Sequence, residues 1–262
     1  KNYKDVVIVA SKEQYEPLFE LLQNKGAVST LEDRRWFAKE AFGVSSSYDS
    51  AIFDYMDAGN MTAFRKAVNN KKELRYGENP HQKGAYFGDL DALFDQLHGR
   101  EISYNNLLDI EASVSLIADF DETTVAILKH NNACGIASRP TVADAWKAAL
   151  EADPVSAFGG IIVTYRLVDE VAANEINNIF FEIIIAPDYT PEAFAVLAQK
   201  KNRIILKQKA QVEGTVQYRS LLNGVLVQDR DLSTQTEADL KLVTKRSLQG
   251  TEEQDLLFGE TY

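Results

Sequence analysis

A regular alternation of short apolar runs and helix signals, beginning near residue 123, constrains the fold more than any other feature of this chain. Four segments are predicted to form buried strands, because they are rich in β-branched and apolar residues. They are Thr123–Lys129, Gly160–Tyr165, Glu182–Ala186 and Arg203–Gln208. Helices are expected between these strands, over Thr141–Ala152 and Asp169–Asn178 and from Thr190-Pro191 onward. Strands that alternate with helices build a layered α/β sandwich.

Other segments refine this prediction. Leu107, Ile110, Val114 and Ile117 share one helical face, which predicts an amphipathic helix. Asn223-Gly224, placed between two strand-like runs, indicates a hairpin. The sheet is therefore expected to be mixed.

The opening third of the chain shows a different pattern, in which one predicted strand is followed by helices. Asp5–Ala10 is predicted to form a strand, and Ser11 with Gln14 a capping box for a helix that ends near Gly26. Two further helices are expected over Leu31–Ala41 and Tyr48–Met56. The stretch Asn69–Lys72 is polar and charged, and the loop Leu74–Gln82 follows it. A domain boundary is therefore expected here, between regions 1–70 and 71–262.

Composition excludes several function classes. The formal net charge is −11 and the isoelectric point about 4.9, so most of the surface repels nucleic acid and anionic membranes. Cys134 is the only cysteine, which excludes an internal disulfide and a zinc site of paired cysteines. No apolar run reaches the length of a membrane span, and Lys1–Asp5 shows no signal-peptide pattern. We expect a cytoplasmic protein with no nucleic-acid or membrane partner.

The strongest chemical signal is Lys129-His130-Asn131-Asn132-Ala133-Cys134-Gly135, directly after a predicted strand. Ligands of open α/β sheets bind at the carboxyl ends of strands. A histidine at such a place can transfer protons near neutral pH. The alternative interpretation is a polar loop with a structural histidine.

Three more segments are candidates. In Leu74–Gln82, an arginine beside a tyrosine can hold a phosphate and stack on a heterocycle, unless the segment is only a surface turn. The two glycines of Asp153–Gly160 allow close approach of a ligand, although a tight helix-to-strand connection needs them equally. The side-chain amides of Ser103–Asp109 could hydrogen-bond a ligand, or they could simply cap the amino end of a helix.

Taken together, these four segments resemble the bifunctional enzymes that combine AICAR transformylase with IMP cyclohydrolase. The matching stretches are LRYGENPHQ, SYNNLLD, KHNNACG and DPVSAFGG, with IIIAP at Ile183–Pro187 and VLVQDRD at Val225–Asp231. Their order and intervals fit from end to end of the chain. Six dispersed motifs in order are far more specific than any one of them.

The resemblance implies transfer of a formyl group from 10-formyltetrahydrofolate to the 5-amino group of AICAR, giving FAICAR. His130 would be the principal proton-transfer residue, and Lys129 would support it and stabilise the developing oxyanion. The implied substrate-binding residues are Arg75 at the phosphate, Tyr76, Asn106 at the base or carboxamide, Phe158 and Gly159 in the nucleotide pocket, and Glu182. The implied fold is similar to that of cytidine deaminases, and no catalytic metal is implied.

The same resemblance implies how the chain relates to a longer protein. Region 1–70 would be the tail of the cyclohydrolase domain, with Lys1 a remnant of the site that closes FAICAR to IMP, and region 71–262 the first part of the transformylase domain. The chain would be an internal fragment of a homodimer whose sites form across the subunit interface. The alternative function is a catalytically silent fragment that binds the nucleotide without turnover.

Overall fold

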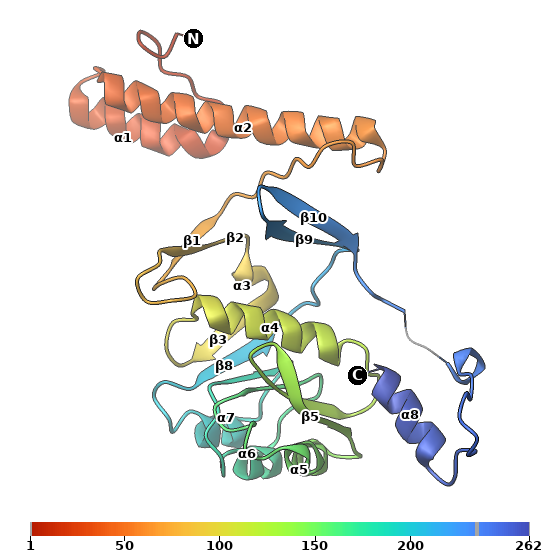
Figure 1. The fold of residues 1–262 in the computed structure, drawn as a ribbon. Coiled ribbons are helices and arrows are strands. Elements are labelled where there is room, and N and C mark those ends of the chain that lie inside the picture. Colours follow the sequence, from red (N-terminus) through yellow and green to blue (C-terminus); the bar gives the residue numbers. More distant parts are fainter. Residues whose placement is uncertain (1, 234–235, 262) are drawn as a thin grey trace. The chain divides into compact units, whose positions relative to one another are not determined.

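The computed structural model describes residues 2–233 and 236–261, which divide into two compact units at Asn69/Asn70 (Figure 1). The first unit is helical. It contains a short 3₁₀ helix, η1 (Lys12–Gln14), followed by α1 (Tyr15–Lys25) and α2 (Leu31–Asp57). Gly26 ends α1 in the left-handed conformation, as the sequence predicts.

Two predictions for the first unit are wrong. Residues 5–10 form no strand, since Val6 and Ile8 remain more than 40% exposed and the segment pairs with no other strand of the described chain. The helix break expected after Ala41 is also absent, because α2 runs through it for 27 residues. The hydroxyls of Ser46 and Ser47 both donate to the carbonyl of Gly43, so these polar residues are satisfied inside the helix.

The second unit is built on a six-stranded mixed sheet in the order β3-β8-β7-β6-β4-β5. The strands are β3 (Phe94–His98), β4 (Thr124–Lys129), β5 (Asn132–Ser138), β6 (Ile161–Thr164), β7 (Ile183–Ala186) and β8 (Ile204–Gln208). β6, β7 and β8 are parallel, whereas β3, β4 and β5 are antiparallel to their neighbours. The predicted α/β fold with a mixed sheet is confirmed.

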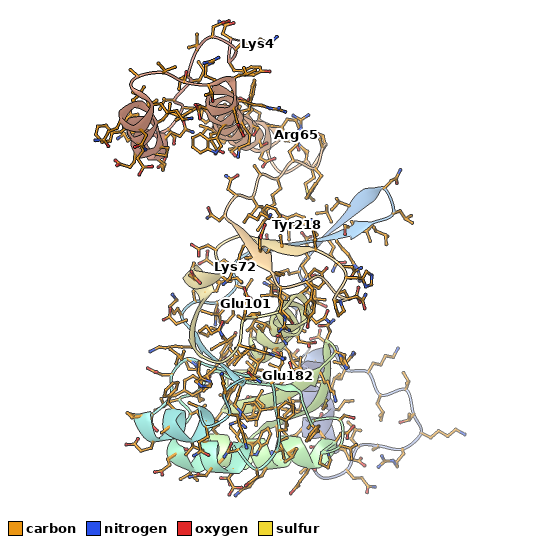
Figure 2. All side chains as sticks on the ribbon, turned by 90° about the vertical axis from the view of Figure 1, so that its left-hand side faces the viewer. Lys4, Arg65, Lys72, Glu101, Glu182 and Tyr218 are labelled. Carbon is orange, nitrogen blue, oxygen red and sulfur yellow. The ribbon has the colours of Figure 1, made fainter. Side chains whose placement is uncertain are left out.

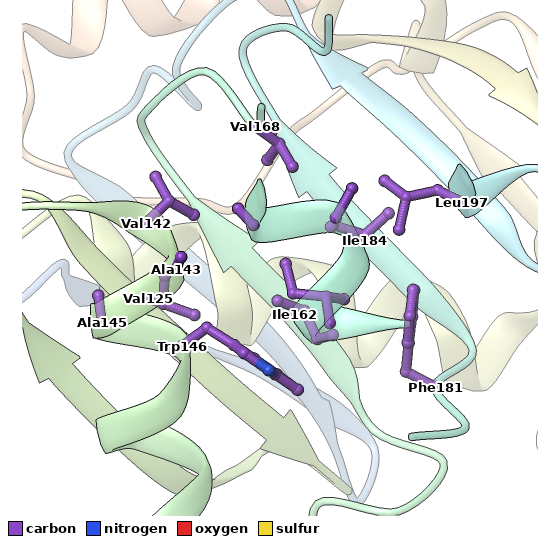
Figure 3. Close-up of a cluster of buried hydrophobic side chains, with 14 of the residues drawn as sticks. Val125, Val142, Ala143, Ala145, Trp146, Ile162, Val168, Phe181, Ile184 and Leu197 are labelled. Atoms are coloured by element: carbon purple, nitrogen blue, oxygen red, sulfur yellow. The ribbon is translucent and has the colours of Figure 1, made fainter. Parts of the chain in front are cut away.

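Helices cover both faces of this sheet (Figure 1). On one face α4 (Tyr104–Ile117) buries Ile110, Val114 and Ile117, three members of the predicted apolar stripe. The other face is covered by α5 (Val142–Ala152), α6 (Glu170–Ile176) and α7 (Pro191–Leu197). Alternate residues of each strand supply the two cores, as the period of a strand requires. Figure 3 shows the second core, in which Trp146 packs beside Val125 and Ile162.

Two small hairpins lie outside the main sheet. One pairs β1 (Lys71–Leu74) with β2 (Gly84–Phe87), and the other pairs β9 (Val216–Leu221) with β10 (Gly224–Asp229). The second is the predicted hairpin, with its turn one residue earlier, at Leu222-Asn223. The mixed character of the main sheet therefore comes from β3, β4 and β5, and not from this hairpin. The remaining elements are α3 (Leu90–Leu93), η2 (Glu237–Asp239) and α8 (Glu252–Thr261).

Within residues 2–233 and 236–261, no helix combines the length and the apolar character that crossing a bilayer requires.

Candidate functional site

Lys129 and His130 lie where β4 turns into β5. The predicted loop is much shorter than expected, because Asn132 already begins β5 and only His130 and Asn131 connect the strands. Both have positive φ, 53° and 62°, which is the geometry of a tight two-residue hairpin turn. Histidine and asparagine tolerate this conformation better than most residues. The His130 side chain is exposed at the tip of this hairpin.

The Lys129 side chain connects this turn to a second predicted motif. Its Nζ donates a hydrogen bond of 2.8 Å to the carbonyl of Phe158, in the connection between α5 and β6. In the same connection, Gly159 has a φ of 79° and donates its N–H to the carbonyl of Phe180 at 2.8 Å. The rings of Phe158 and Phe180 lie 5.3 Å apart. Phe158 and Gly159 are therefore held beside Lys129.

The amino end of α4 connects the other motifs. Asn105 Nδ2 donates to the carbonyl of Glu78, in the Arg75–Gln82 loop, at 3.2 Å. One turn further along the helix, Asp109 Oδ1 accepts the backbone N–H of Asn131 at 2.7 Å. The segment Ser103–Asp109 thus contacts both the loop that follows β1 and the turn that carries His130.

Asn106 and Glu182 meet at this helix end. Asn106 Nδ2 donates to Glu182 Oε2 at 3.2 Å, while its Oδ1 accepts the N–H of Ser103 in a capping box. The guanidinium of Arg100 donates to the same Glu182 oxygen at 2.7 Å. Figure 2 labels Glu182, which immediately precedes β7. Two donors therefore converge on one carboxylate oxygen.

Arg75 and Tyr76 form a separate part of the site. Arg75 Nη2 donates to the Tyr76 hydroxyl at 2.9 Å, and its guanidinium lies 4.7 Å from the ring centre. Arg75 is exposed and Tyr76 half-buried. Among the described residues, no hydrogen bond or ion pair joins either side chain to Lys129 or His130. The structure joins the Lys129-His130 turn to Phe158 and Gly159, whereas the loop that carries Arg75 and Tyr76 is linked to this turn through α4, by Asn105 and Asp109.

A cavity of about 490 Å³ opens beside the hairpin. Its lining residues are Lys129, His130, Asn132, Ala133, Cys134, Asp153 and Ser156. Burial raises the pKa of the Cys134 thiol, Asp153 adds to this rise, and Lys129 opposes it. A thiol with a raised pKa stays protonated near neutral pH, so Cys134 is not suited to act as a nucleophile. Hydrogen bonds from Ser156 lower the pKa of Asp153, which keeps a carboxylate at the cavity wall.

Comparison with known proteins places these motifs in a family. The AICARFT/IMPCHase bienzyme family matches residues 1–262. The chain belongs to this family. Two members named bifunctional purine biosynthesis protein PurH are 62% identical over 259 residues, in Bacteroides thetaiotaomicron, and 42% identical over 271 residues, in Rhodospirillum rubrum. Each alignment covers 99% of this chain, which spans about half the length of these relatives, 51% and 52%.

Sequence reasoning about this AICARFT/IMPCHase chain missed Arg100 and Phe180. Each contacts a predicted residue from a distant part of the sequence, Arg100 at Glu182 and Phe180 at Phe158, and neither carries a motif of its own. His98 is half-buried, and its Nδ1 lies 2.9 Å from the carbonyl oxygen of Arg203, because β3 pairs with β8.

The direction of the strands at the site also differs from expectation. Lys129 does lie at the carboxyl end of β4, but β4 runs antiparallel to β6. The parallel strands β6, β7 and β8 therefore begin at this edge of the sheet, and the rule for carboxyl ends does not account for the site. In the parts of the chain that the structure describes, no three His, Cys, Asp or Glu side chains are grouped to hold a metal ion. Lys1 lies outside the described residues.

One family motif residue has a packing explanation. A Cβ at Gly135 would lie 2.0 Å from the backbone carbonyl of Ala149, so β5 packs on α5 too closely for any side chain. We expect Gly135→Ala to destabilise the second unit by about 1–3 kcal/mol, since backbone must move. The control is Gly43→Ala inside α2, where a Cβ meets nothing within 4 Å. That change should stabilise the first unit by about 0.5–1 kcal/mol. Denaturant unfolding measures both, and an unchanged midpoint for Gly135→Ala would contradict the packing argument.

Proposed function

We propose that region 71–262 carries the first part of an AICAR transformylase site that serves purine biosynthesis. The reaction is transfer of the formyl group of 10-formyltetrahydrofolate to the 5-amino group of AICAR, giving FAICAR. Region 1–70 is proposed to be the tail of the cyclohydrolase domain, and the longer protein also to cyclise FAICAR to IMP. Family membership supports both parts, because the relatives are named bifunctional purine biosynthesis proteins.

One observation carries the proposal: hydrogen bonds connect all four predicted motifs. Asn105 contacts the Arg75–Gln82 loop, Asp109 contacts the His130-Asn131 turn, and Lys129 contacts Phe158. A catalytic site needs such fixed geometry, because misplaced groups contribute little to the rate. Four unrelated surface loops would have no reason to be connected in this way.

The proposed chemistry follows from the amine. The AICAR 5-amino group is conjugated with its ring and carboxamide, so it is a weak nucleophile and must lose a proton as it attacks. His130 is proposed to accept that proton. Lys129 is proposed to stabilise the negative charge that develops on the formyl oxygen when the amine attacks the formyl carbon. As this charge collapses, the bond between the formyl carbon and N10 of the folate breaks, and N10 takes up a proton to leave as tetrahydrofolate. One N–H of the Lys129 ammonium is held by Phe158, which fixes the group and leaves two N–H donors for the oxyanion.

Substrate binding is proposed for the remaining residues. Arg75 would hold the phosphate and Tyr76 would stack on or bond to the nucleotide, while Phe158 and Gly159 line its pocket. Arg100 and Asn106 both donate to Oε2 of Glu182. Its other carboxylate oxygen, Oε1, would therefore accept a hydrogen bond from the substrate. Asn106 orients Glu182 and keeps its second amide N–H for the base or carboxamide.

Among the described residues, no hydrogen bond or ion pair joins the side chains of Arg75 and Tyr76 to the His130 turn. We propose a homodimer in which these residues serve different sites. The remaining proposals are a cytoplasmic location, a deaminase-like layered fold, no catalytic metal, and no nucleic-acid or membrane partner. The alternative function is a silent fragment that binds AICAR without turnover, which a monomeric chain with an incomplete site would favour.

A formyl-transfer assay tests the proposal. AICAR and 10-formyltetrahydrofolate are supplied to this chain and to a protein of the relatives' full length that contains it. Formation of FAICAR by both would place a sufficient site in the chain. Turnover by the longer protein alone, with AICAR binding to both, would support the silent-fragment alternative. If the folded longer protein gives no FAICAR, the proposed reaction is wrong.

Arg75→Ala tests the phosphate role. Hydrogen bonds to charged groups contribute about 1.5–3 kcal/mol, so we expect AICAR affinity to fall by roughly 10-fold to 100-fold. Calorimetric titration measures the change. The matched control is Arg139→Ala, which removes another exposed arginine, whose guanidinium donates to the carbonyl of the neighbouring Ser138. Equal affinities of the Arg75→Ala and Arg139→Ala variants would exclude Arg75 from phosphate binding.

A further inference from the structure

The two proposed catalytic side chains are held in different ways. The Lys129 ammonium is fixed at its tip, by the hydrogen bond to the carbonyl of Phe158. Within residues 2–233 and 236–261, by contrast, no hydrogen bond or ion pair reaches the exposed ring of His130. The direction in which its Cα–Cβ bond leaves the chain is set by the two peptide groups that flank its Cα. Whatever fixes these peptides therefore also fixes where the imidazole can reach.

The peptide group between His130 and Asn131 is held at both of its polar atoms. Its carbonyl, which belongs to His130, accepts a hydrogen bond of 2.7 Å from Asn132 Nδ2. Its N–H, which belongs to Asn131, donates to Asp109 Oδ1, also at 2.7 Å. A hydrogen bond from an N–H to a carboxylate is stronger than one between neutral groups. The peptide is thus clamped between the next residue of the hairpin and a helix that lies 22 residues away in the sequence.

This clamp acts on a strained turn. His130 and Asn131 both have positive φ, a region that L-residues occupy at a cost. Such conformations persist only where the surrounding structure over-determines them, and they gather at functional sites. Asn132 adjoins the turn and moves with it, so its bond cannot tie the turn to the rest of the domain. Asp109 can do so, because it belongs to α4.

Asp109 is itself firmly placed on that helix. The next residue, Ile110, is 4% exposed and packs with Val114 in the core between α4 and the sheet. The backbone carbonyl of Asp109 accepts the hydroxyl of the fully buried Ser113 at 2.7 Å. The carboxylate therefore links the turn to the main core of the second unit.

We propose that Asp109 is a positioning residue for His130. Its Oδ1 holds the His130-Asn131 peptide, keeps the turn in its left-handed form and so directs the imidazole toward the AICAR amine. The inference rests on the proposed formyl transfer, in which His130 accepts the proton of that amine. Because Asp109 acts through the backbone of the turn, its loss lowers the rate by misplacing the base, without weakening the binding of AICAR.

Amide hydrogen exchange, followed by two-dimensional NMR on this chain, tests the clamp without any turnover. The Asn131 N–H is expected to exchange about tenfold faster or more in Asp109→Ala than in the unaltered chain. Asp109→Asn keeps an Oδ1 acceptor and should retain most of the protection. Alanine favours helices, so Asp109→Ala is expected to fold, and its spectrum shows whether it does. Equal exchange at Asn131 in the folded Asp109→Ala variant and the unaltered chain would overturn the proposal.

Rates in a protein of the relatives' full length test the positioning role. Asp109→Ala should lower kcat about tenfold or more and leave AICAR affinity within about twofold. Asp109→Asn should restore kcat to within about threefold of the unaltered protein, because it restores the acceptor. The matched control is Glu111→Ala, which removes an exposed carboxylate from the same helix and should change neither quantity.

Two results would contradict the positioning role, and they are distinguishable. An unchanged kcat in Asp109→Ala, beside an active unaltered protein, would leave Asp109 a structural residue only and overturn the proposal. If the unaltered protein forms no FAICAR, the proposed reaction is wrong and the role of Asp109 fails with it. The exchange measurement would still show whether the clamp exists.

Discussion

Replacing His130 by alanine is expected to lower the rate of formyl transfer by about 10²–10⁴-fold, the usual contribution of a general base. AICAR affinity should stay within about tenfold, or 1.4 kcal/mol, because His130 is assigned to proton transfer and not to binding. The variant is made in a protein of the relatives' full length. Steady-state rates and calorimetric affinity are measured on the same preparation.

The turn geometry calls for a second variant. His130 has a φ of 53°, so alanine strains the hairpin as well as removing the imidazole. His130→Asn removes the imidazole but keeps a residue that accepts this conformation, and it should lose as much rate. His81→Ala is the control, since His81 is an exposed histidine of another loop. Retained turnover in His130→Asn would remove His130 from the mechanism.

Trp146→Ala is expected to destabilise the second unit by about 3–5 kcal/mol, as large-to-small changes in cores do. Trp146 is 1% exposed on α5 and belongs to the core shown in Figure 3, with strand residues that include Val125 and Ile162. A cavity there cannot collapse easily, because the strands beneath it are fixed by pairing on both sides.

Denaturant unfolding followed by far-UV circular dichroism measures this loss without relying on tryptophan emission. The matched control is Trp36→Ala on α2 of the first unit, where the indole is 41% exposed. That change should cost much less, because less apolar surface leaves water there on folding. Similar losses for the two variants would contradict the assignment of Trp146 to the main core.

Much of the second unit could be predicted because local signals and tertiary structure agree there. Thr141 and Thr190 cap α5 and α7 as expected, and the apolar runs of β4, β6, β7 and β8 are buried on both faces. β5 was missed because Asn132–Ser138 lacks a strand composition. It is a strand because it pairs with β4 across the His130-Asn131 turn. Pairing of this kind is a tertiary effect that periodicity does not encode.

The site was predictable as a set of motifs but not as a geometry. Sequence order places Asn106 and Glu182 76 residues apart, and nothing in either segment predicts that their side chains meet. Arg100 was invisible for the same reason, since its partner is set by the packing of α4 against the sheet. In the first unit the local signal was misleading. The apolar run at residues 5–10 predicts a strand, but it pairs with no other strand of the described chain and therefore forms none.

Calorimetric titration of AICAR into this chain is the measurement that decides whether residues 71–262 hold a nucleotide pocket. We predict saturable binding that Arg75→Ala weakens by at least tenfold. Circular dichroism on the same sample establishes that the chain is folded. Absence of binding by the folded chain would contradict the pocket, even though membership of the AICARFT/IMPCHase family would stand.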